Sequence, residues 1–527
     1  MEKRVIRGDS SREYVFNNHV DSCIGTGRMG LALTKEYQEQ LKFVQEKIGF
    51  KHIRGHGLFC DDMAIYQDRR SFDKEAPIEY NFTYLDMVMD FYLSIGIRPY
   101  LELGFMPYKL ASGEQTIFYW KGNTTPPKDY EEWKKLVQAT LRHLIMRYGH
   151  DEVVTWPVEV WNEPNLPGFW YNADMEEYFK LFKVSFEAVK EVDPAFKVGG
   201  PAVCGGSDKP WITAFMKFCH EQGLAVDYVS RHHYATTFPE RAGHYGYAEL
   251  MDPENVDDGF PDLHSTREII DEYGEYKGLP IHITEFNTSY IPNCPLHDTN
   301  QNAAYIAHQL SRLGDDNEAY SYWTFGDLFE EGGVPFTLFH GGFGLVTNGC
   351  IPKPTFWTFV FFKKLKGEGA KCIYKDDTTV VAAYPDGSVR GVAWNMSLKR
   401  NGREFENEYH IPSKLLTFAD GTYTGDQTDP EYVLITQTVD EEVCNPLKIW
   451  HDIGEPAHLN SEQLELIKAG AYPAVSTKKI QGSSDDVIFD IPVKENGVVY
   501  FEIKAVKTVS DRGYDYNRVM QFDKSAD

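Results

Sequence analysis

From about residue 16 to residue 365, short apolar runs alternate with amphipathic stretches of helix length. Strands that alternate with helices pair in parallel, and eight such units close into a barrel with the helices outside. We therefore predict an α/β fold, a (β/α)8 TIM barrel over residues 16–365. The predicted strands are Cys23–Thr26, Phe50–Gly57, Ile97–Gly104, Val158–Asn162, Phe196–Pro201, Asp227–His232, Pro280–Glu285 and Ala319–Phe325, and the helices between them include Tyr130–Tyr148, Asp174–Val192 and Asn302–Leu313.

The pattern changes after Lys366, where short strands are separated by turn residues. A chain of 527 residues exceeds the size of a single core, so a second domain is expected. We predict a β-sandwich over residues 366–527, with residues 1–15 packing against it. The predicted hairpins pair Thr378–Tyr384 with Val389–Trp394, and Val487–Pro492 with Val498–Ile503.

The formal net charge of -26 argues against nucleic acid and anionic membranes as partners, because both would repel an acidic surface. The first residues contain no apolar run typical of a signal peptide, and no segment approaches the length of a membrane span. We therefore expect a cytoplasmic location. The eight cysteines form no Cys-x-x-Cys pair, so they are interpreted as free thiols and no metal site is predicted.

One strand runs directly into a turn that carries a carboxylate, in the segment Glu159-Val-Trp-Asn-Glu-Pro-Asn165. Barrels of this type place their chemistry at the C-terminal strand ends, which is where Glu163 falls. Partial burial beside Trp161 would raise the pKa of Glu163, as the proton donor of glycoside cleavage requires. Asn162 could bind the 2-hydroxyl of a sugar. The alternative is a glutamate in an ordinary loop.

A second strand ends in the same way, in the segment Pro280-Ile-His-Ile-Thr-Glu-Phe-Asn287. Because strands four and seven face each other across the barrel mouth, Glu285 is expected opposite Glu163. Two such carboxyl groups about 5–5.5 Å apart would support a double displacement with retention of configuration. The alternative is a Glu285 that only forms a structural salt bridge.

These motifs resemble those of a known family. Trp-Asn-Glu-Pro-Asn at 161–165 and Ile-Thr-Glu-Phe-Asn-Thr-Ser-Tyr at 283–290 are similar to the acid/base and nucleophile motifs of glycoside hydrolase family 39, in particular of its bacterial β-D-xylosidases. The resemblance extends through most of the barrel, over residues 25–33, 53–57, 102–107, 121–128, 340–345 and 351–354.

The resemblance implies that Glu163 is the general acid/base and Glu285 the nucleophile. It also implies a pocket for the terminal sugar, in which Trp323 offers a flat apolar face and a carboxylate accepts bonds from hydroxyls. The implied pocket residues are His56, Asn162, His232, Tyr234, Trp323 and either Glu330 or Glu331. For the histidines and aromatic residues, core packing is the alternative interpretation.

The implied activity is that of a retaining exo-β-D-xylosidase that releases xylose from the non-reducing end of short xylo-oligosaccharides. No cofactor or metal is required, and the family resemblance implies a homo-oligomer, often a tetramer. A different sugar remains open, such as an α-L-arabinosyl, β-glucosyl or uronic-acid residue, because His233, Gly326 and Tyr108 depart from the family pattern. A non-catalytic sugar-binding protein is the alternative from another class, although it would not need two opposed glutamates.

The segment Gly25-Thr-Gly-Arg-Met-Gly30 matches the glycine pattern of dinucleotide-binding proteins. That function also requires an acidic residue at the end of the next strand, to hold a ribose. The next predicted strand ends in His56 and Gly57 instead. We therefore interpret these glycines as a tight loop at the barrel rim.

Overall fold

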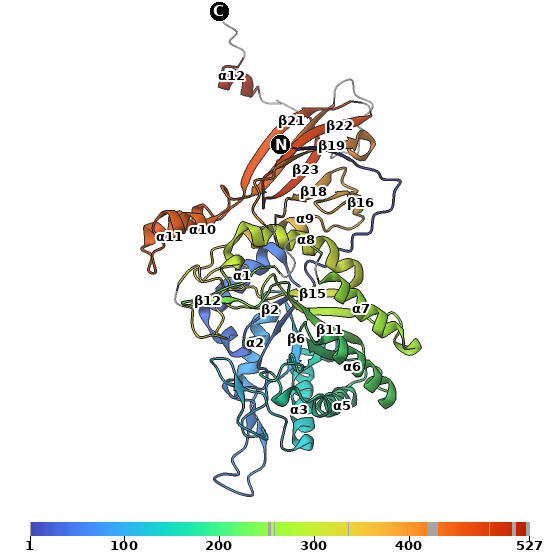
Figure 1. Cartoon of the computed structure of the whole chain (residues 1–527), viewed down its shortest axis with the longest axis vertical. Coiled ribbons are helices and arrows are strands. Elements are labelled where there is room, and N and C mark those ends of the chain that lie inside the picture. Colours follow the sequence, from blue (N-terminus) through green and yellow to red (C-terminus); the bar gives the residue numbers. More distant parts are fainter. Residues whose placement is uncertain are drawn as a thin grey trace, which may run out of the picture.

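The computed structural model describes residues 2–250, 255–257, 259–335, 337–397, 399–418, 430–483, 485–507 and 513–522. Its centre is a closed barrel of eight parallel strands (Figure 1). In chain order the strands are β2 (Cys23–Thr26), β3 (His52–Gly55), β6 (Arg98–Leu103), β9 (Val158–Val160), β10 (Val198–Val203), β11 (Tyr228–His233), β14 (Ile281–Phe286) and β15 (Ala319–Tyr322). Each lies within, or overlaps, a predicted strand, which confirms the TIM barrel.

Helices cover the outside of the barrel (Figure 1). They are α1 (Lys35–Ile48), α2 (Thr83–Ser94), α3 (Tyr130–Tyr148), α4 (His150–Val153), α5 (Met175–Val192), α6 (Asp208–Gln222), α7 (Phe260–Asp271), α8 (Asn300–Asp316) and α9 (Pro354–Lys364). α3 has the bounds predicted from its apolar face. It begins where the Asp129 side chain accepts bonds from two backbone N–H groups, and it ends at Gly149.

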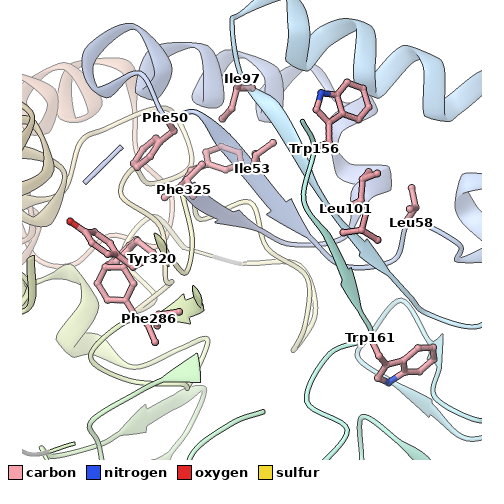
Figure 2. Packing of buried hydrophobic residues seen from close by; sticks show 14 of the residues in the cluster. Phe50, Ile53, Leu58, Ile97, Leu101, Trp156, Trp161, Phe286, Tyr320 and Phe325 are labelled. Carbon is pink, nitrogen blue, oxygen red and sulfur yellow. The ribbon is translucent and has the colours of Figure 1, made fainter. Parts of the chain in front are cut away.

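Alternation along the strands sends one set of side chains outward and the other into the barrel. Ile53 and Leu101 lie on neighbouring strands in the apolar layer, where both are almost fully buried (Figure 2). The adjacent residues Arg54 and Glu102 point the other way and contact each other inside the barrel. The same alternation therefore builds the core and the polar interior.

Short two-stranded ribbons extend from the barrel. They are β4 (Tyr66–Gln67) with β5 (Glu79–Tyr80), β7 (Thr116–Ile117) with β8 (Gly122–Asn123), and β12 (Glu240–Ala242) with β13 (Tyr245–Tyr247). The ribbon β7–β8 reaches the barrel mouth, because the backbone N–H of Tyr119 in its turn donates to the carbonyl of Glu331.

Two further sheets form the predicted β-sandwich. One contains β16 (Lys371–Lys375), β17 (Thr379–Ala383), β18 (Val389–Trp394), β23 (Val498–Val506), β20 (Glu431–Val439) and β21 (Ala474–Gln481), and the other β1 (Glu2–Arg7), β19 (Phe405–Pro412) and β22 (Asp486–Val493). The sheets share a buried core in which the rings of Tyr409 and Phe501 lie 4.6 Å apart. Helices α10 (Pro446–Asp452) and α11 (Ser461–Ala469) project from this unit, and α12 (Tyr516–Met520) follows it (Figure 1).

The sandwich rests on the barrel through α9 (Figure 1). Phe361 stacks on Tyr500 with ring centroids 5.8 Å apart, and Phe362 lies 6.2 Å from Trp394. At the N-terminus, β1 pairs in parallel with β19 of the sandwich. The division into residues 16–365 and 366–527, with the N-terminal segment joining the second unit, stays our proposal.

One predicted hairpin is wrong. β17 and β18 pair as predicted, whereas β22 pairs with β19 and β23 pairs with β18 and β20. The turn at Asn496, which adopts a φ of +52°, therefore carries the chain from one sheet to the other. A hairpin turn and a connection between sheets use the same turn residues, so the sequence does not distinguish them. Within the described ranges, every helix is too short or too polar to cross a membrane.

Candidate active site

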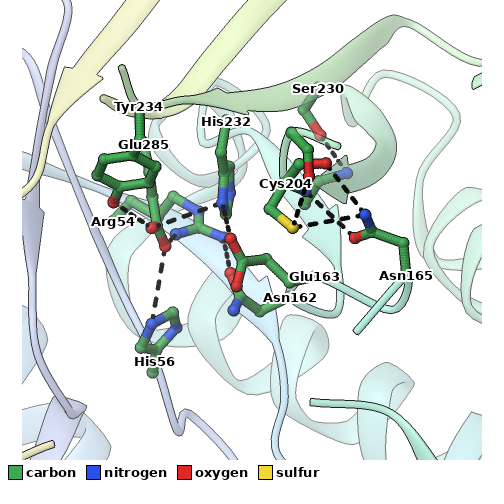
Figure 3. Close-up of polar contacts among 12 residues, drawn as sticks. Arg54, His56, Asn162, Glu163, Asn165, Cys204, Ser230, His232, Tyr234 and Glu285 are labelled. Carbon is green, nitrogen blue, oxygen red and sulfur yellow. Dashed lines mark hydrogen bonds and ion pairs between the residues drawn. The ribbon is translucent and has the colours of Figure 1, made fainter. Parts of the chain in front are cut away.

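Glu163 and Glu285 lie together at the C-terminal mouth of the barrel, the first beyond the end of β9 and the second one residue before the end of β14 (Figure 3). One oxygen of each carboxylate and one ring nitrogen of His232 all lie within 4.8 Å of one another. Enzymes that invert configuration hold their carboxyl groups about 6.5–9.5 Å apart, to admit a water molecule. The shorter separation supports direct attack by one carboxylate and therefore retention.

Arg54 on β3 organises the floor of the site. Its guanidinium is fully buried and donates to Glu285 Oε1 at 2.7 Å and Asn162 Oδ1 at 2.8 Å (Figure 3). It also donates to Glu159 Oε2 at 2.6 Å. Glu102 Oε2 lies 3.0 Å from Nη2. The surrounding carboxylates raise the pKa of Arg54 well above its usual value despite burial. Arg54 therefore supplies a fixed positive charge beneath the two glutamates.

Both oxygens of Glu285 are engaged. Oε1 accepts from Arg54, and Oε2 accepts from the Tyr234 hydroxyl at 2.8 Å. Burial, together with the nearby Glu285 charge, raises the pKa of Tyr234 well above its usual value, so the phenol remains a donor. His56 Nε2 lies 3.7 Å from Oε1, and His56 Nδ1 lies 2.8 Å from Glu102. Charge-assisted hydrogen bonds are shorter and stronger than neutral ones, so the bond from Arg54 fixes the orientation of the Glu285 carboxylate.

Glu163 has a different environment. Its backbone and that of Trp161 adopt positive φ values of 44° and 70°, a conformation that is uncommon outside glycine and concentrated at functional sites. The turn is held by Asn165, whose amide nitrogen donates to the carbonyl of Cys204 at 3.0 Å (Figure 3). Burial raises the pKa of Glu163 from 4.5 to about 7. The carboxyl group can therefore hold a proton near neutral pH.

His232 lies between the two glutamates. Its Nδ1 is 2.8 Å from Glu163 Oε1 and 3.5 Å from Glu285 Oε2. Burial lowers the pKa of His232 to about 4, so the imidazole is neutral near pH 7. It can therefore form a hydrogen bond with Glu163 without adding a charge to the site. This environment distinguishes Glu163, the protonatable group, from Glu285, the group paired with a cation.

The other predicted pocket residues surround this pair. Asn162 uses Oδ1 for Arg54, which leaves its amide nitrogen as a donor. The Trp323 ring lies 4.7 Å from the His56 ring and belongs to an apolar group against which Tyr234 packs. Of the two neighbouring acids, Glu330 forms an ion pair with Arg28, with an N–O distance of 2.8 Å.

Glu331 is the neighbouring acid whose pKa is affected by the charges of Glu163 and Glu285. Burial and the charges of Glu285 and Glu163 raise the pKa of Glu331 well above its usual value. Its backbone carbonyl accepts from Tyr119 N, which fixes this segment against the β7–β8 ribbon. We infer that Glu331, and not Glu330, is the carboxylate available to a sugar hydroxyl.

Sequence reasoning missed the central network of Arg54, Glu102 and Glu159. All three are fully buried in apolar barrel strands. A charged residue in the middle of such a strand must point into the barrel and find a partner there, because an unpaired buried charge is too costly. That signal was present in the sequence, although it does not reveal that three strands bring their charges to one point.

The residues that depart from the family pattern have other surroundings than the glutamate pair. His233 is buried and its Nε2 lies 3.0 Å from Gln309 of α8, Tyr108 is 58% exposed, and Gly326 packs against Gln40. Gly25 lies within β2, so the interpretation of these glycines as a tight rim loop applies only to Gly27 and Gly30, which follow the strand. A Cβ atom on Gly25 would overlap the Trp323 ring, so this glycine leaves space for the indole.

Glu163, His232 and Glu285 are also the one group of donors, among the described residues, whose spacing could hold a metal ion. Each of the three already has a protein partner, and the Arg54 guanidinium lies 2.7 Å from Glu285. A fixed positive charge at this distance would repel a cation. The donor set therefore fits an acid and a nucleophile better than it fits a metal centre.

Comparison with known proteins agrees with this geometry. The profile described as glycosyl hydrolases family 39 matches residues 6–485. The chain belongs to this family. A β-xylosidase of Geobacillus stearothermophilus is 44% identical over 505 residues, which cover 96% of this chain and 96% of that protein. A β-xylosidase of Caldicellulosiruptor saccharolyticus is 34% identical over 491 residues, covering 93% and 96%.

Solved structures of the family show the same architecture. The crystal structure of a monomeric β-xylosidase from Caulobacter crescentus CB15 superposes with a TM-score of 0.84 at 32% identity, over 96% of this chain and 100% of that chain. This family 39 chain is therefore a retaining glycoside hydrolase. The roles of Glu163 and Glu285 stay predictions, which their spacing and environments support.

Proposed function

We propose that this family 39 enzyme is an exo-acting β-D-xylosidase that releases xylose from the non-reducing end of short xylo-oligosaccharides. The observation that carries the proposal is the pair Glu163 and Glu285, with oxygens within 4.8 Å above the Arg54 network. Similarity over nearly the whole length to two proteins named β-xylosidase supports the choice of sugar.

The proposed reaction has two steps. First, Glu285 attacks the anomeric carbon while Glu163 gives its proton to the leaving oxygen, so the glycosidic bond breaks and a glycosyl-enzyme forms. Glu163, now ionised, then takes a proton from water, and that water displaces Glu285 from the sugar. Each step inverts the anomeric centre, and the product therefore retains the β configuration.

The proposed sugar contacts use the remaining residues. The Asn162 amide nitrogen would donate to the 2-hydroxyl, Trp323 would cover the apolar face of the ring, and Glu331 would accept from the hydroxyls. A uronic acid would bring a negative charge into a pocket whose buried guanidinium, that of Arg54, is already paired with Glu102, Glu159 and Glu285, which disfavours the uronidase alternative. A non-catalytic binding protein is disfavoured because binding alone gives no reason for an acid of pKa about 7 beside an ion-paired carboxylate.

A cytoplasmic location, a role in xylan degradation and homo-oligomerisation, for example into tetramers, belong to the same proposal. The eight cysteines are all free thiols, as is usual in reducing compartments. Apolar side chains are exposed near α11 and the start of β21, where Leu466 is 51%, Tyr472 50% and Val475 64% exposed. Contact between copies of the chain would remove this apolar surface from water.

The choice of sugar predicts a substrate order. On a panel of p-nitrophenyl glycosides, we expect the β-D-xyloside to have the highest kcat/KM, above the α-L-arabinoside, the β-glucoside and a uronide. Xylobiose should be cleaved faster than polymeric xylan, because an exo-acting pocket binds chain ends. Product analysis by chromatography measures both. Faster cleavage of the polymer, or a preference for the uronide, would overturn the proposed substrate.

The environment of Glu163 predicts the alkaline limb of the pH profile. The protonated form is the acid, and burial moves its pKa from 4.5 to about 7. With a poor leaving group, kcat/KM should therefore stay high just below pH 7 and fall about tenfold per pH unit above it. The profile of the free enzyme from pH 5 to 9 measures this limb. A limb near pH 4.5 would contradict the assignment of Glu163 as the acid.

A further inference from the structure

Lys353 is a fully buried lysine that the proposed mechanism does not use. It lies in the Ile351-Pro-Lys-Pro354 segment that leads into α9. Its ammonium lies 2.7 Å from Asp298 Oδ1, 2.8 Å from Asp327 Oδ2 and 2.7 Å from the carbonyl of Gly342. An ammonium has three donors, and each has a partner here. Such complete pairing is what makes a buried charge tolerable.

The partners come from three different segments at the active end of the barrel. Asp327 follows β15, Asp298 precedes α8, and the carbonyl belongs to the loop of residues 340–345. Both carboxylates also hold the backbone of this loop. Asp298 Oδ2 accepts from Gly341 N at 2.8 Å, and Asp327 Oδ1 accepts from Gly344 N at 2.7 Å. The lysine and its two acids therefore fix the loop at several points.

The three glycines of the loop allow this close approach. A Cβ atom on Gly341 would overlap the backbone of Cys294, and Cβ atoms on Gly342 and Gly344 would overlap Asp327. Gly341 also has a φ of +73°, which favours glycine. The 340–345 loop is therefore packed directly against the ion cluster and has no space in which to shift.

The loop places Phe343 behind the proposed sugar platform. Phe343 is 1% exposed, and its ring centroid lies 5.2 Å from that of Phe329, which in turn lies 5.8 Å from Trp323. These three rings form one buried cluster. The carbonyl of Phe343 also accepts from Thr324 N at 3.3 Å, directly after the tryptophan. A displacement of the loop would therefore reach the indole.

We propose that Lys353 is a positioning residue for Trp323, and that its buried ammonium fixes the 340–345 loop and thereby the plane of the indole against the bound sugar. The inference rests on the proposed function, because the plane of Trp323 matters only if the sugar binds there. The indole also contacts His56, at 4.7 Å between ring centroids, and lies 5.9 Å from the Arg54 guanidinium. A change in the orientation of the indole would therefore also affect the residues next to the proposed nucleophile.

A double-mutant cycle tests this inference, with Lys353→Met, Trp323→Ala and the combined variant assayed on p-nitrophenyl β-D-xyloside. Lys353→Met alone should lower kcat/KM by about tenfold to a hundredfold, the scale of a misplacement near 1 Å. KM should rise more than kcat falls, because the ring contacts the sugar before and during the reaction. In the Trp323→Ala background, the lysine change should cost less than about twofold.

Lys353→Met leaves two buried carboxylates without a cation, which destabilises the fold, so a second variant is needed in case the first does not fold. The combination Lys353→Met, Asp298→Asn and Asp327→Asn removes all three charges while keeping acceptors for the loop N–H groups. If Lys353→Met does not fold, this triple variant takes its place in the double-mutant cycle. The loss of kcat/KM that it causes should again be much smaller in the Trp323→Ala background. Lys363→Met is the matched control, because Lys363 pairs with the buried Asp21 before β2, at the opposite end of the barrel. This control should keep wild-type kcat/KM.

The outcomes distinguish an error in the proposed function from an error in the role proposed for Lys353. If Trp323→Ala leaves kcat/KM unchanged, the proposed sugar platform is wrong, whatever the lysine does. If Trp323→Ala impairs the enzyme but the lysine change costs the same factor in both backgrounds, Lys353 only stabilises the fold. Its positioning role is then overturned while the proposed function stands. Full activity of the neutral triple variant would also overturn it.

Discussion

Replacing Glu285 by alanine is expected to lower kcat/KM at least about 10⁴-fold for every glycoside, whatever its leaving group. The variant lacks the carboxylate proposed to form the glycosyl-enzyme, and among the described residues no other carboxylate accepts from both Arg54 and Tyr234. Pre-steady-state measurements should show no burst of released phenol. Azide, if it restores turnover, should enter from the vacated face and give the α-glycosyl azide.

A matched control exists directly before the neighbouring strand, β15. Glu318 Oε2 accepts from Ile281 N, at the opposite end of β14 from Glu285. Glu318→Ala removes a carboxylate from the same strand pair and should keep activity within about twofold, as expected for a substitution outside the site. If Glu285→Ala retains the burst, or if azide gives the β-anomer, the nucleophile lies elsewhere.

Much of the barrel follows from the sequence alone. A parallel strand is buried on both faces and reads as an apolar run, so Val158–Asn162 and Pro280–Glu285 could be recognised without a structure. The rule that barrel chemistry lies at C-terminal strand ends then singled out Glu163 and Glu285. The hairpin between β22 and β23 was predicted wrongly because turn residues indicate that the chain changes direction but not which sheet the next strand joins.

The polar floor of the site could not be predicted to the same degree. Arg54, Glu102 and Glu159 lie within strands, where period-two alternation gives the direction of each side chain but not its partner. The choice between Glu330 and Glu331 depends on Arg28, which lies about 300 residues earlier in the chain and pairs with Glu330. Contacts over such separations are set by barrel closure, which brings β2 beside β15.

The structure gives the surroundings of the two glutamates, and these surroundings are what distinguish their proposed roles. A guanidinium and a phenol donate hydrogen bonds to Glu285, whereas Glu163 is buried beside a neutral histidine. The barrel therefore gives two identical side chains different environments, one ion-paired and one protonatable near neutral pH, as the predicted roles of nucleophile and acid require. That difference predicts different consequences when each is removed.

Replacing Glu163 by alanine is expected to spare the first step for activated substrates and to block the second. A dinitrophenyl xyloside needs no proton on its leaving group, so Glu285 should still be glycosylated, whereas an alkyl xyloside or xylobiose should react at least about 10²-fold more slowly. Without a base to activate water, the glycosyl-enzyme should accumulate and be detectable by mass spectrometry. Azide needs no base, so it should restore turnover and give the β-glycosyl azide.

The anomer of the azide product decides the assignment. Azide attacks the glycosyl-enzyme from the face that Glu163 vacates, and two successive inversions give the β-azide. In the Glu285 variant azide attacks the substrate once, from the opposite face, and gives the α-azide. If the Glu163 variant gives the α-azide and the Glu285 variant the β-azide, the two roles are reversed. If Glu163→Ala loses equal factors on dinitrophenyl and alkyl xylosides, Glu163 is not the proton donor, and its pKa near 7 reflects burial alone.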